Sequence, residues 1–480
     1  MGDSEETSRA ALFFDKDHDE ECDDEDDEDD ESDEDDLVVF AALNKAMNAS
    51  ANVAALKVDH RTRPRKKRKV FRHDRAYVCL LQDYLGPEAT FAGSAFVQMF
   101  RITRARFERL YVDAISSGNQ YYKADNRTNP ATKMTIACVQ ARLLLPLKCL
   151  AYGVPSHTFC DYFQMSKTQA RECCKKFNLL IPALYSKEYL RLPTKKDLVA
   201  INKLHSAVHK IDGMFGSLDC MHTTWKNCPV AWQGSFRGKS QQKSTIVLEA
   251  IADHHLFFWH LSYGWAGTLN DINILNQSPF LRSLTDGVFN ELESDVVPYS
   301  IGDEIFDKMF VLVDGIYPRY SRFVKTLKQP VSQSEQRFAK WQEAARKDIE
   351  RAFGVLQAKF QAVARPIHTL RLEEIGAMVT TCLVLHNICV SDRIMGDVHA
   401  RYDPSYNLSV DETTYADTTQ CRNTIEKQRP VDSNDVAVNG LANFNPVGAR
   451  AIAQRSEFRK LEDRDEWNRL NTAILKLKGG

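Results

Sequence analysis

Apolar runs separated by turn residues predict three β-strands within residues 211–275. These runs are MFGSLDCMHTTW, STIVLEAIADHH and LFFWHLSYGWAG, and β-branched and aromatic residues bounded by turn signals are typical of strands. The sequence NDINIL then predicts the start of a helix, with Asn270 or Asp271 as its N-cap. A further apolar run, MFVLVDGIY at 309–317, predicts another strand.

Apolar positions that recur at spacings of three and four predict helices on both sides of these strands. Upstream, this period runs through FVQMFRITRARFERLYVDAI, and helices are also expected in TIACVQARLLLPLKCLAYG and after Ser166, a good N-cap. Downstream, it runs through SQSEQRFAKWQEAARKDIERAFGVLQAKF and LEEIGAMVTTCLVLHNICV. Three strands, a helix, a strand and then helices predict an α/β fold with a sheet covered by helices.

These patterns and the distribution of charge divide the chain into five segments. They are a disordered acidic N-terminal tail (1–60), a basic segment (61–72), a helical domain (75–205), the α/β domain (210–395) and a polar C-terminal tail (396–480). The last of these has no clear period until WNRLNTAILKLK, where a late helix is expected.

The net charge of −2 hides a strong asymmetry. Residues 15–36 hold 18 acidic residues and one Lys, whereas in the rest of the chain 62 basic residues face 47 acidic ones. A basic body fits a nucleic-acid partner. The acidic tail is then either an internal competitor for the basic surface or a solvated segment. The run RTRPRKKRKVFR, centred on Lys66-Lys67-Arg68-Lys69, resembles a nuclear import signal and could also serve as a phosphate-binding arm.

Several classes of protein are not expected. The twelve cysteines form no CxxC pair, the N-terminus is acidic, and no stretch reaches the roughly 18 apolar residues of a membrane span. We therefore expect a reduced protein inside the cell, in the nucleus and not in a membrane. A GxxxxGK[ST] loop is absent, so use of ATP is not expected.

Histidines in the α/β region show no pattern of zinc ligands. They are His222, His254, His255, His260 and His386. The pair His386-x-x-Cys389 has a ligand-like spacing, but it lies on an apolar helix, which favours a place in the core.

Carboxylates stand at the ends of the predicted strands and on one helix. Asp219 follows the apolar run 214–218, Asp314 follows 310–313, and Glu350 lies on the helix in KDIERAFG. If the strands of Asp219 and Asp314 are adjacent, their side chains meet at one edge of the sheet. Acids from separate elements suit Mg²⁺ or Mn²⁺ and two-metal phosphodiester chemistry. Asp271 is a fourth candidate, or simply an N-cap.

Basic residues near these acids are candidates for contact with DNA. They are Arg237, Lys239 and Lys243 in the aromatic run WKNCPVAWQGSFRGKSQQK, and Arg346, Lys347 and Arg351 on the helix of Glu350. The aromatic run could equally be a loop with a packed Trp. On the same helix, Gly354 lies one turn from Glu350 and suggests the close approach of a backbone, a strand or DNA.

The helix after Ser166 is a second candidate for DNA contact, as the second helix of a helix-turn-helix. Its exposed residues would then be Lys167, Gln169, Arg171, Lys175 and Lys176. The alternative is a helical bundle that only supports the α/β domain.

Four motifs together resemble the PIF/Harbinger transposase family. They are GSLDCMHTTWKNCP, WAGTLNDINIL, LVDGIYP and ARKDIERAFGVLQAKF, followed by CLVLHNI. The resemblance covers roughly residues 75–395 and is strongest over 210–390. It implies a ribonuclease-H-like core with an Asp-Asp-Glu site, Mg²⁺ or Mn²⁺ as cofactor, and cut-and-paste DNA transposition.

Carried over by motif, the first acid is Asp219 and the last is Glu350. The middle acid is either Asp314, which is separated from Glu350 by 35 residues, or Asp271. Both motifs depart from the family pattern, because Val313 and Ile316 stand where glycines are usual and Trp265-Ala266-Gly267-Thr268 has an unusual start. The second acid of ribonuclease-H-like folds ends a strand, which favours Asp314.

The resemblance leaves two functions open. One is an active DNA endonuclease or transposase, a homo-oligomer that works with a separate Myb-like DNA-binding protein. The other is a domesticated nuclear protein that binds DNA or chromatin without cutting DNA.

Overall fold

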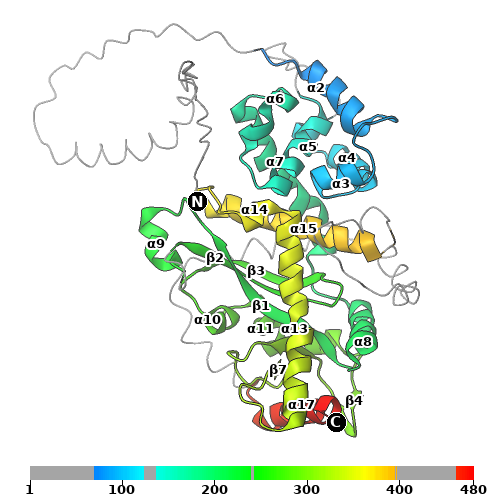
Figure 1. Ribbon diagram of the computed structural model, residues 1–480, viewed down its shortest axis with the longest axis vertical. Helices are drawn as coiled ribbons and strands as arrows, with labels where there is room; N and C mark the ends of the chain where they lie inside the picture. The colour runs from blue at the N-terminus through cyan, green and yellow to red at the C-terminus, as the bar shows by residue number, and fades with distance from the viewer. Residues whose placement is uncertain (1–69, 124–136, 239–242, 395, 397–460, 480) are drawn as a thin grey trace, which may run out of the picture. The chain divides into compact units, whose positions relative to one another are not determined.

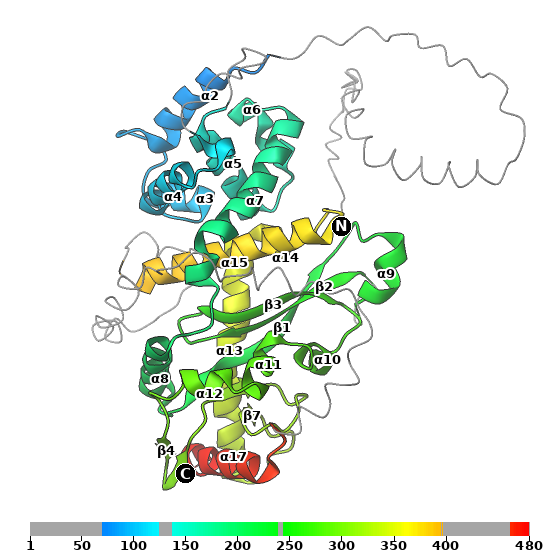
Figure 2. The same ribbon diagram turned by 180° about the vertical axis from the view of Figure 1, so that it is seen from behind.

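The computed structural model describes residues 70–123, 137–238, 243–394, 396 and 461–479 (Figures 1 and 2). Val70–Gly480 forms one compact unit. The predicted acidic tail, the cluster at 66–69, Lys239 and most of the predicted C-terminal tail lie outside the described residues.

A five-stranded mixed sheet forms the centre of the α/β region. Its order is β3 (Phe258–Ala266), β2 (Thr245–Ala252), β1 (Met214–Thr224), β6 (Phe310–Val313) and β7 (Phe323–Lys325). The first three strands pair antiparallel, whereas β6 pairs parallel with β1 and with β7. The four predicted strands are confirmed, and the predicted mixed α/β class is confirmed with them. β7 is too short to have stood out by its pattern.

Helices cover both faces of the sheet. Figures 1 and 2 show α13 (Gln333–Lys359) on one face and α11 (Pro279–Thr285) and α12 (Val288–Leu292) on the other. The side chains of β6 alternate accordingly: Phe310 and Leu312 pack in the cluster that includes α13, and Val311 and Val313 in the cluster that includes α11 and α12. A central strand with both faces covered is apolar throughout, which explains the uninterrupted run FVLV.

The remaining elements of the α/β region are short or lie at its margins. They are α8 (Lys195–His209), α9 (Val230–Phe236), α10 (Asp271–Leu275), the hairpin β4 (Tyr299–Ile301) and β5 (Glu304–Phe306), α14 (Gln361–Ala364) and α17 (Arg464–Gly479). α17 is the predicted late helix. It packs against α13 and β7 and buries Leu470 and Ile474, so residues 464–478 belong to the core of this region and not to a tail.

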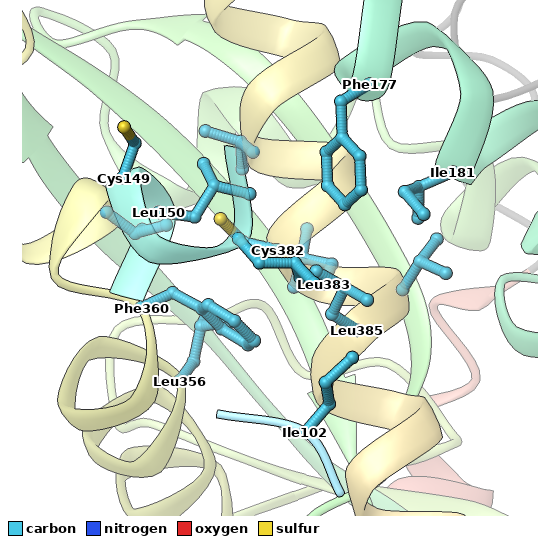
Figure 3. Packing of buried hydrophobic residues seen from close by; sticks show 14 of the residues in the cluster. Ile102, Cys149, Leu150, Phe177, Ile181, Leu356, Phe360, Cys382, Leu383 and Leu385 are labelled. Atoms are coloured by element: carbon cyan, nitrogen blue, oxygen red, sulfur yellow. The ribbon is translucent and has the colours of Figure 1, made fainter. Parts of the chain in front are cut away.

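The N-terminal region is helical, as predicted. Its elements are α2 (His73–Leu80), a π-helical turn (Leu81–Leu85), α3 (Ser94–Phe100), α4 (Arg104–Ser116), α5 (Val139–Tyr152), α6 (Cys160–Phe163), α7 (Lys167–Tyr189) and 3-10 turns at Gln120–Tyr122 and Ser156–Phe159. These helices gather around α15 (Leu372–Ile394). Figure 3 shows Leu150 of α5, Phe177 of α7, Leu383 of α15 and Phe360 at the end of α13 in one apolar cluster.

α15 is long and apolar enough to cross a membrane by length and composition alone. However, 78% of its most apolar window is buried inside the protein. His386 and Cys389 lie in that buried stretch, and the His386 Nε2–H donates to the carbonyl of Leu256 at 2.8 Å. The prediction that this His-Cys pair is part of the core is confirmed.

α7 has the N-cap that the sequence predicts, because the Ser166 hydroxyl accepts a hydrogen bond from the amide of Gln169. The helix packs along α15 and α5. Lys175 forms an ion pair with Glu374 of α15 at 3.1 Å, and Lys176 pairs with Glu172. These contacts match the supporting bundle, and the idea that α7 reads DNA stays a prediction.

Candidate functional site

The parallel register of β1 and β6 brings two of the predicted acids together. Ser217 pairs with Leu312, and Asp219 and Asp314 each lie two residues beyond that pair, at the same end of these two parallel strands. Ser217 Oγ donates to the carbonyl of Ala345 on α13, so this side of β1 faces that helix. Because side chains alternate along a strand, Asp219 faces α13 as well, and Asp314 directly follows the last residue of β6.

Glu350 reaches the same place from α13. Arg346, one turn earlier on the helix, contacts both acids: its Nη1 lies 3.0 Å from Asp219 Oδ2 and its Nη2 lies 2.7 Å from Glu350 Oε1. One guanidinium therefore joins the central strand to the helix. Glu350 is half-exposed, with 45% of its side chain accessible, so this side of the cluster opens to solvent.

Burial makes the Asp219 carboxylate costly to ionise without a cation. Its pKa is raised above the ordinary value because of burial, and the charges of Asp271 and Glu350 add to that rise. The amide of Cys220, which donates to Asp219 Oδ1 at 2.8 Å, and the Arg346 guanidinium act in the opposite direction. A carboxylate whose pKa is raised by burial and like charges gains from a bound positive charge.

Asp314 lies at the turn that follows β6. Its Oδ1 accepts from the amide of Gly315 at 2.6 Å, and its carbonyl accepts from the amide of Tyr317. Lys325 of β7 is the neighbouring base: burial lowers the pKa of Lys325, and the charge of Asp314 partly offsets that effect.

Asp271 is not the N-cap of α10. The cap is Asn270, whose side chain accepts from the amide of Asn273 at 2.8 Å, so the capping interpretation of Asp271 was wrong. Asp271 is the first residue of the helix. Burial is the main cause of the raised pKa values of Asp219, Cys220 and Tyr317, and the negative charge of Asp271 raises all three further. Asp271 therefore lies within electrostatic reach of the acids that Arg346 joins.

The predicted DNA-contact residues divide into two groups. Arg237, Lys243 and Lys347 are exposed, as a contact with DNA requires. Arg346 and Arg351 are instead engaged with carboxylates, Arg346 as described and Arg351 in an ion pair with Asp348.

The aromatic run around α9 is partly core. Trp225 is 1% exposed, packs against Phe236 and donates from Nε1 to the carbonyl of Thr369. Trp232 is 41% exposed. The packed-Trp interpretation therefore holds for Trp225, and Trp232 keeps an accessible ring beside the exposed Arg237.

Gly354 does not serve close packing inside the protein. A Cβ built at this position meets no heavy atom within 4 Å among the described residues, which excludes the expected approach of a backbone or a strand. The surface of α13 one turn beyond Glu350 is open.

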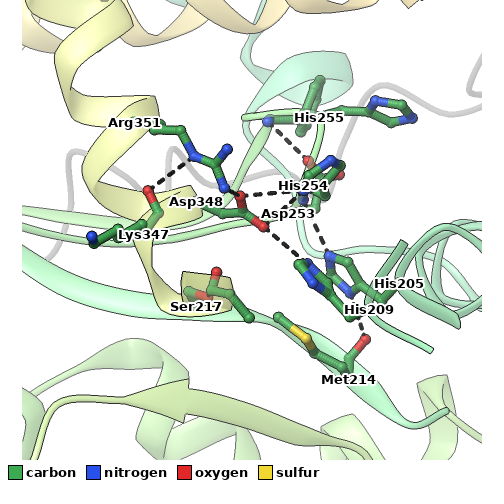
Figure 4. Close-up of polar contacts among 12 residues, drawn as sticks. His205, His209, Met214, Ser217, Asp253, His254, His255, Lys347, Asp348 and Arg351 are labelled. Atoms are coloured by element: carbon green, nitrogen blue, oxygen red, sulfur yellow. Dashed lines mark hydrogen bonds and ion pairs between the residues drawn. The ribbon is translucent and has the colours of Figure 1, made fainter. Parts of the chain in front are cut away.

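A second polar cluster was not expected from the sequence. His209 of α8, His254 after β2 and Asp348 of α13 meet in one cluster, as Figure 4 shows. The candidate zinc ligands in the sequence included His254 but neither His209 nor Asp348, and zinc was not expected because His254 has no partner at ligand spacing in the sequence. The sequence signal that could have predicted the cluster is Asp348. It lies three residues after Ala345 and four before Ala352, on the buried face of the helix, and a buried charge needs partners.

The acids fit a hard divalent cation. Asp219 and Glu350 both point to one positive group, the Arg346 guanidinium, and Asp314 directly follows β6, the strand that runs parallel to β1. Carboxylate oxygens from a strand, a turn and a helix are the ligands that Mg²⁺ and Mn²⁺ prefer.

Comparison with known proteins adds the family. Residues 187–397 match the family described as plant transposon protein. This part of the chain is similar to that family. Protein ALP1-like of Arabidopsis thaliana is 20% identical over 323 residues, which cover 65% of this chain and 75% of that protein. No solved structure gives a significant match.

The part of the chain that matches the plant transposon family contains the whole sheet and α13. It therefore includes all four candidate acids, and also the cluster of His209, His254 and Asp348.

Proposed function

We propose that this chain is a member of the plant transposon family and a metal-dependent DNA endonuclease and transposase of PIF/Harbinger type. It cleaves and joins DNA phosphodiester bonds at Asp219, Asp314 and Glu350. The observation that carries the proposal is the convergence of Asp219 and Glu350 on one guanidinium, with Asp314 directly after β6, the strand that runs parallel to β1.

The topology supports a ribonuclease-H-like core. Three antiparallel strands are followed by two that run parallel to the first, and a long helix crosses the sheet beside the acids. This arrangement puts an acid on the central strand, a second after the neighbouring strand and a third on the helix.

Asp219, Asp314 and Glu350 are the residues that would hold Mg²⁺ or Mn²⁺. Such cations activate a water or a 3′-hydroxyl and stabilise the leaving oxygen. Within the chain, Arg346 offsets the charges of Asp219 and Glu350 before loading. Once those acids bind a cation, its guanidinium can pair with a DNA phosphate beside Lys347.

For the middle acid we favour Asp314 over Asp271. Asp314 directly follows β6 at the end of the sheet where Asp219 lies, whereas Asp271, in a helix that begins after β3, adds to the effect of burial in raising the pKa of Asp219, Cys220 and Tyr317. Asp271 would then adjust the charge of the site without being a ligand.

Nicking of supercoiled plasmid DNA with Mn²⁺ tests the assignment. Wild-type protein should nick, and Glu350→Gln and Asp314→Asn should lower the rate by at least about 100-fold, since each removes a ligand. Glu343→Gln is a matched control, because Glu343 is exposed on the same helix. Nicking by Asp314→Asn together with loss in Asp271→Asn would instead make Asp271 the ligand.

The alternative is a nuclear protein that binds DNA or chromatin without cutting. One observation favours it: Arg346 already neutralises Asp219 and Glu350 within the chain. On this alternative, the wild type and Glu350→Gln would bind DNA equally and neither would nick it.

Location and partners follow from the same proposal. The chain would act in the nucleus, as a homo-oligomer on DNA, together with a Myb-like DNA-binding protein. Light scattering of the DNA complex and co-purification from nuclei test these points, and a monomeric complex that binds specific DNA alone would contradict them.

A further inference from the structure

We propose that His209, His254 and Asp348 bind a zinc ion. The three side chains come from α8, the turn after β2 and α13, and one ligand atom of each lies within 4.8 Å of the others. Figure 4 shows the two imidazoles directed at the carboxylate of Asp348. The proposal does not depend on the nuclease assignment.

The spacing of the ligand atoms suits tetrahedral zinc. Asp348 Oδ2 lies 3.2 Å from His209 Nε2 and 3.0 Å from His254 Nδ1. Zinc bonds of about 2.0–2.1 Å at the tetrahedral angle separate neighbouring ligand atoms by about 3.3 Å. The ligand atoms all lie within 4.8 Å of one another, so the two histidine nitrogens are the pair that must settle at about 3.3 Å to admit the ion.

The donor set also selects the metal. Two imidazole nitrogens and one carboxylate oxygen suit zinc, whereas Mg²⁺ prefers oxygen ligands alone.

Surrounding residues hold the ligands in place. Arg351 pairs with Asp348 Oδ1, which leaves Oδ2 to face the two histidines. His205 donates from Nδ1 to the carbonyl of Met214 and accepts at Nε2 from the amide of His254, so it fixes the turn that carries His254. Such outer contacts orient metal ligands in known sites.

Access for the ion and for a fourth ligand comes from the His254 side. The His254 side chain is 21% exposed, against 10% for His209 and 1% for Asp348. Three protein ligands leave one position for water. The ion would tie α8 and the end of β2 to α13, two residues before Glu350.

Two conservative variants separate zinc binding from plain hydrogen bonding. In His254→Asn the amide nitrogen takes the place of Nδ1, and in His209→Gln it takes the place of Nε2. Each keeps a donor to Asp348 but is a poor zinc ligand. His157→Ala, at an exposed histidine, is the control.

The experiment uses the full chain without a histidine tag, incubated with Zn²⁺, desalted and measured by mass spectrometry for metal content. We expect about one zinc per chain in the wild type and in His157→Ala. We expect at least about 100-fold weaker binding in His254→Asn and His209→Gln. Zinc should raise the melting temperature only of the first two proteins. Without zinc, all four should melt alike, which shows that the variants fold.

Two results would overturn the proposal. One is a wild type that retains no zinc, or variants that retain as much as the wild type, since the cluster would then be held by hydrogen bonds alone. The other is loss of zinc in Asp219→Asn or Glu350→Gln, because the ion would then lie at the acids. If these two variants keep zinc but do not nick DNA, both proposals stand independently.

Discussion

At the residue scale, the candidate acids were recognisable because each interrupts an apolar pattern. Asp219 and Asp314 follow buried runs, and Glu350 lies beside the apolar stripe of its helix. The partners of these side chains were not recognisable. Arg346, which the sequence predicts to contact phosphate, contacts Asp219 and Glu350, because a helix crossing the sheet brings together charges that lie 127 positions apart in the sequence.

Gly354→Ala is expected to raise the free energy of unfolding by about 0.5–1 kcal/mol, since Ala favours the helix and the added Cβ meets open space. Gly376→Ala on α15 is matched to it, with equally open surroundings. Urea unfolding should show both gains. DNA affinity should fall only for Gly354→Ala if DNA approaches α13 there, and equal affinities in the two variants would argue against that approach.

Buried His386 should make stability depend on pH. Burial lowers its pKa from 6.5 to about 3, so the folded state excludes a proton that the unfolded state takes up below pH 6.5. The contribution of neutral His386 to the free energy of unfolding is complete above pH 6.5. It declines by about 1.4 kcal/mol per pH unit as the pH falls from 6.5 toward 3. Between pH 7 and pH 5 the wild type should lose about 2 kcal/mol that His386→Gln does not lose. Equal losses by urea unfolding would contradict this.

At the scale of elements, periodicity identified the four strands and the long helices, and missed the pieces that contacts define. β7 has three residues, and its partner β6 lies on the far side of a turn. Arg322, the residue directly before β7, fixes the position of this strand. It forms a buried ion pair with Glu293, the residue directly after α12. Glu293 also accepts from the amide of Met309 at 2.8 Å, directly before β6.

Glu293→Ala should therefore cost about 3–5 kcal/mol, because it leaves Arg322 buried and unpaired. Glu304→Ala, which breaks the exposed pair with Arg469, should cost less than about 1 kcal/mol. Chemical denaturation of both variants measures the difference. A similar small cost for both would mean that water reaches Arg322 and that the pair does not hold β6 and β7.

At the scale of the whole molecule, the distribution of charge suggests competition between segments. Residues 15–36 carry 18 of the 65 acidic residues, and the remainder is basic. Exposed basic residues such as Lys347 and Arg237 are where DNA and an acidic segment would compete.

Removal of residues 1–36 should tighten DNA binding, and most strongly at low salt, because the interaction is between screened charges. Fluorescence anisotropy with one DNA duplex at several salt concentrations measures the effect. Unchanged affinity at matched salt would show that the acidic segment does not compete.

The sequence alone determined the mixed α/β class, the main strands, the capped helices and the family motifs, because these depend on patterns among near neighbours in the chain. The tertiary structure decided which charges meet. It put Asp219 and Asp314 at the same end of two parallel strands and made Asn270, not Asp271, the N-cap of α10. It also brought His209, His254 and Asp348 together from three elements. Such contacts depend on strand order and on the path of α13 across the sheet, and neither is encoded in local spacing.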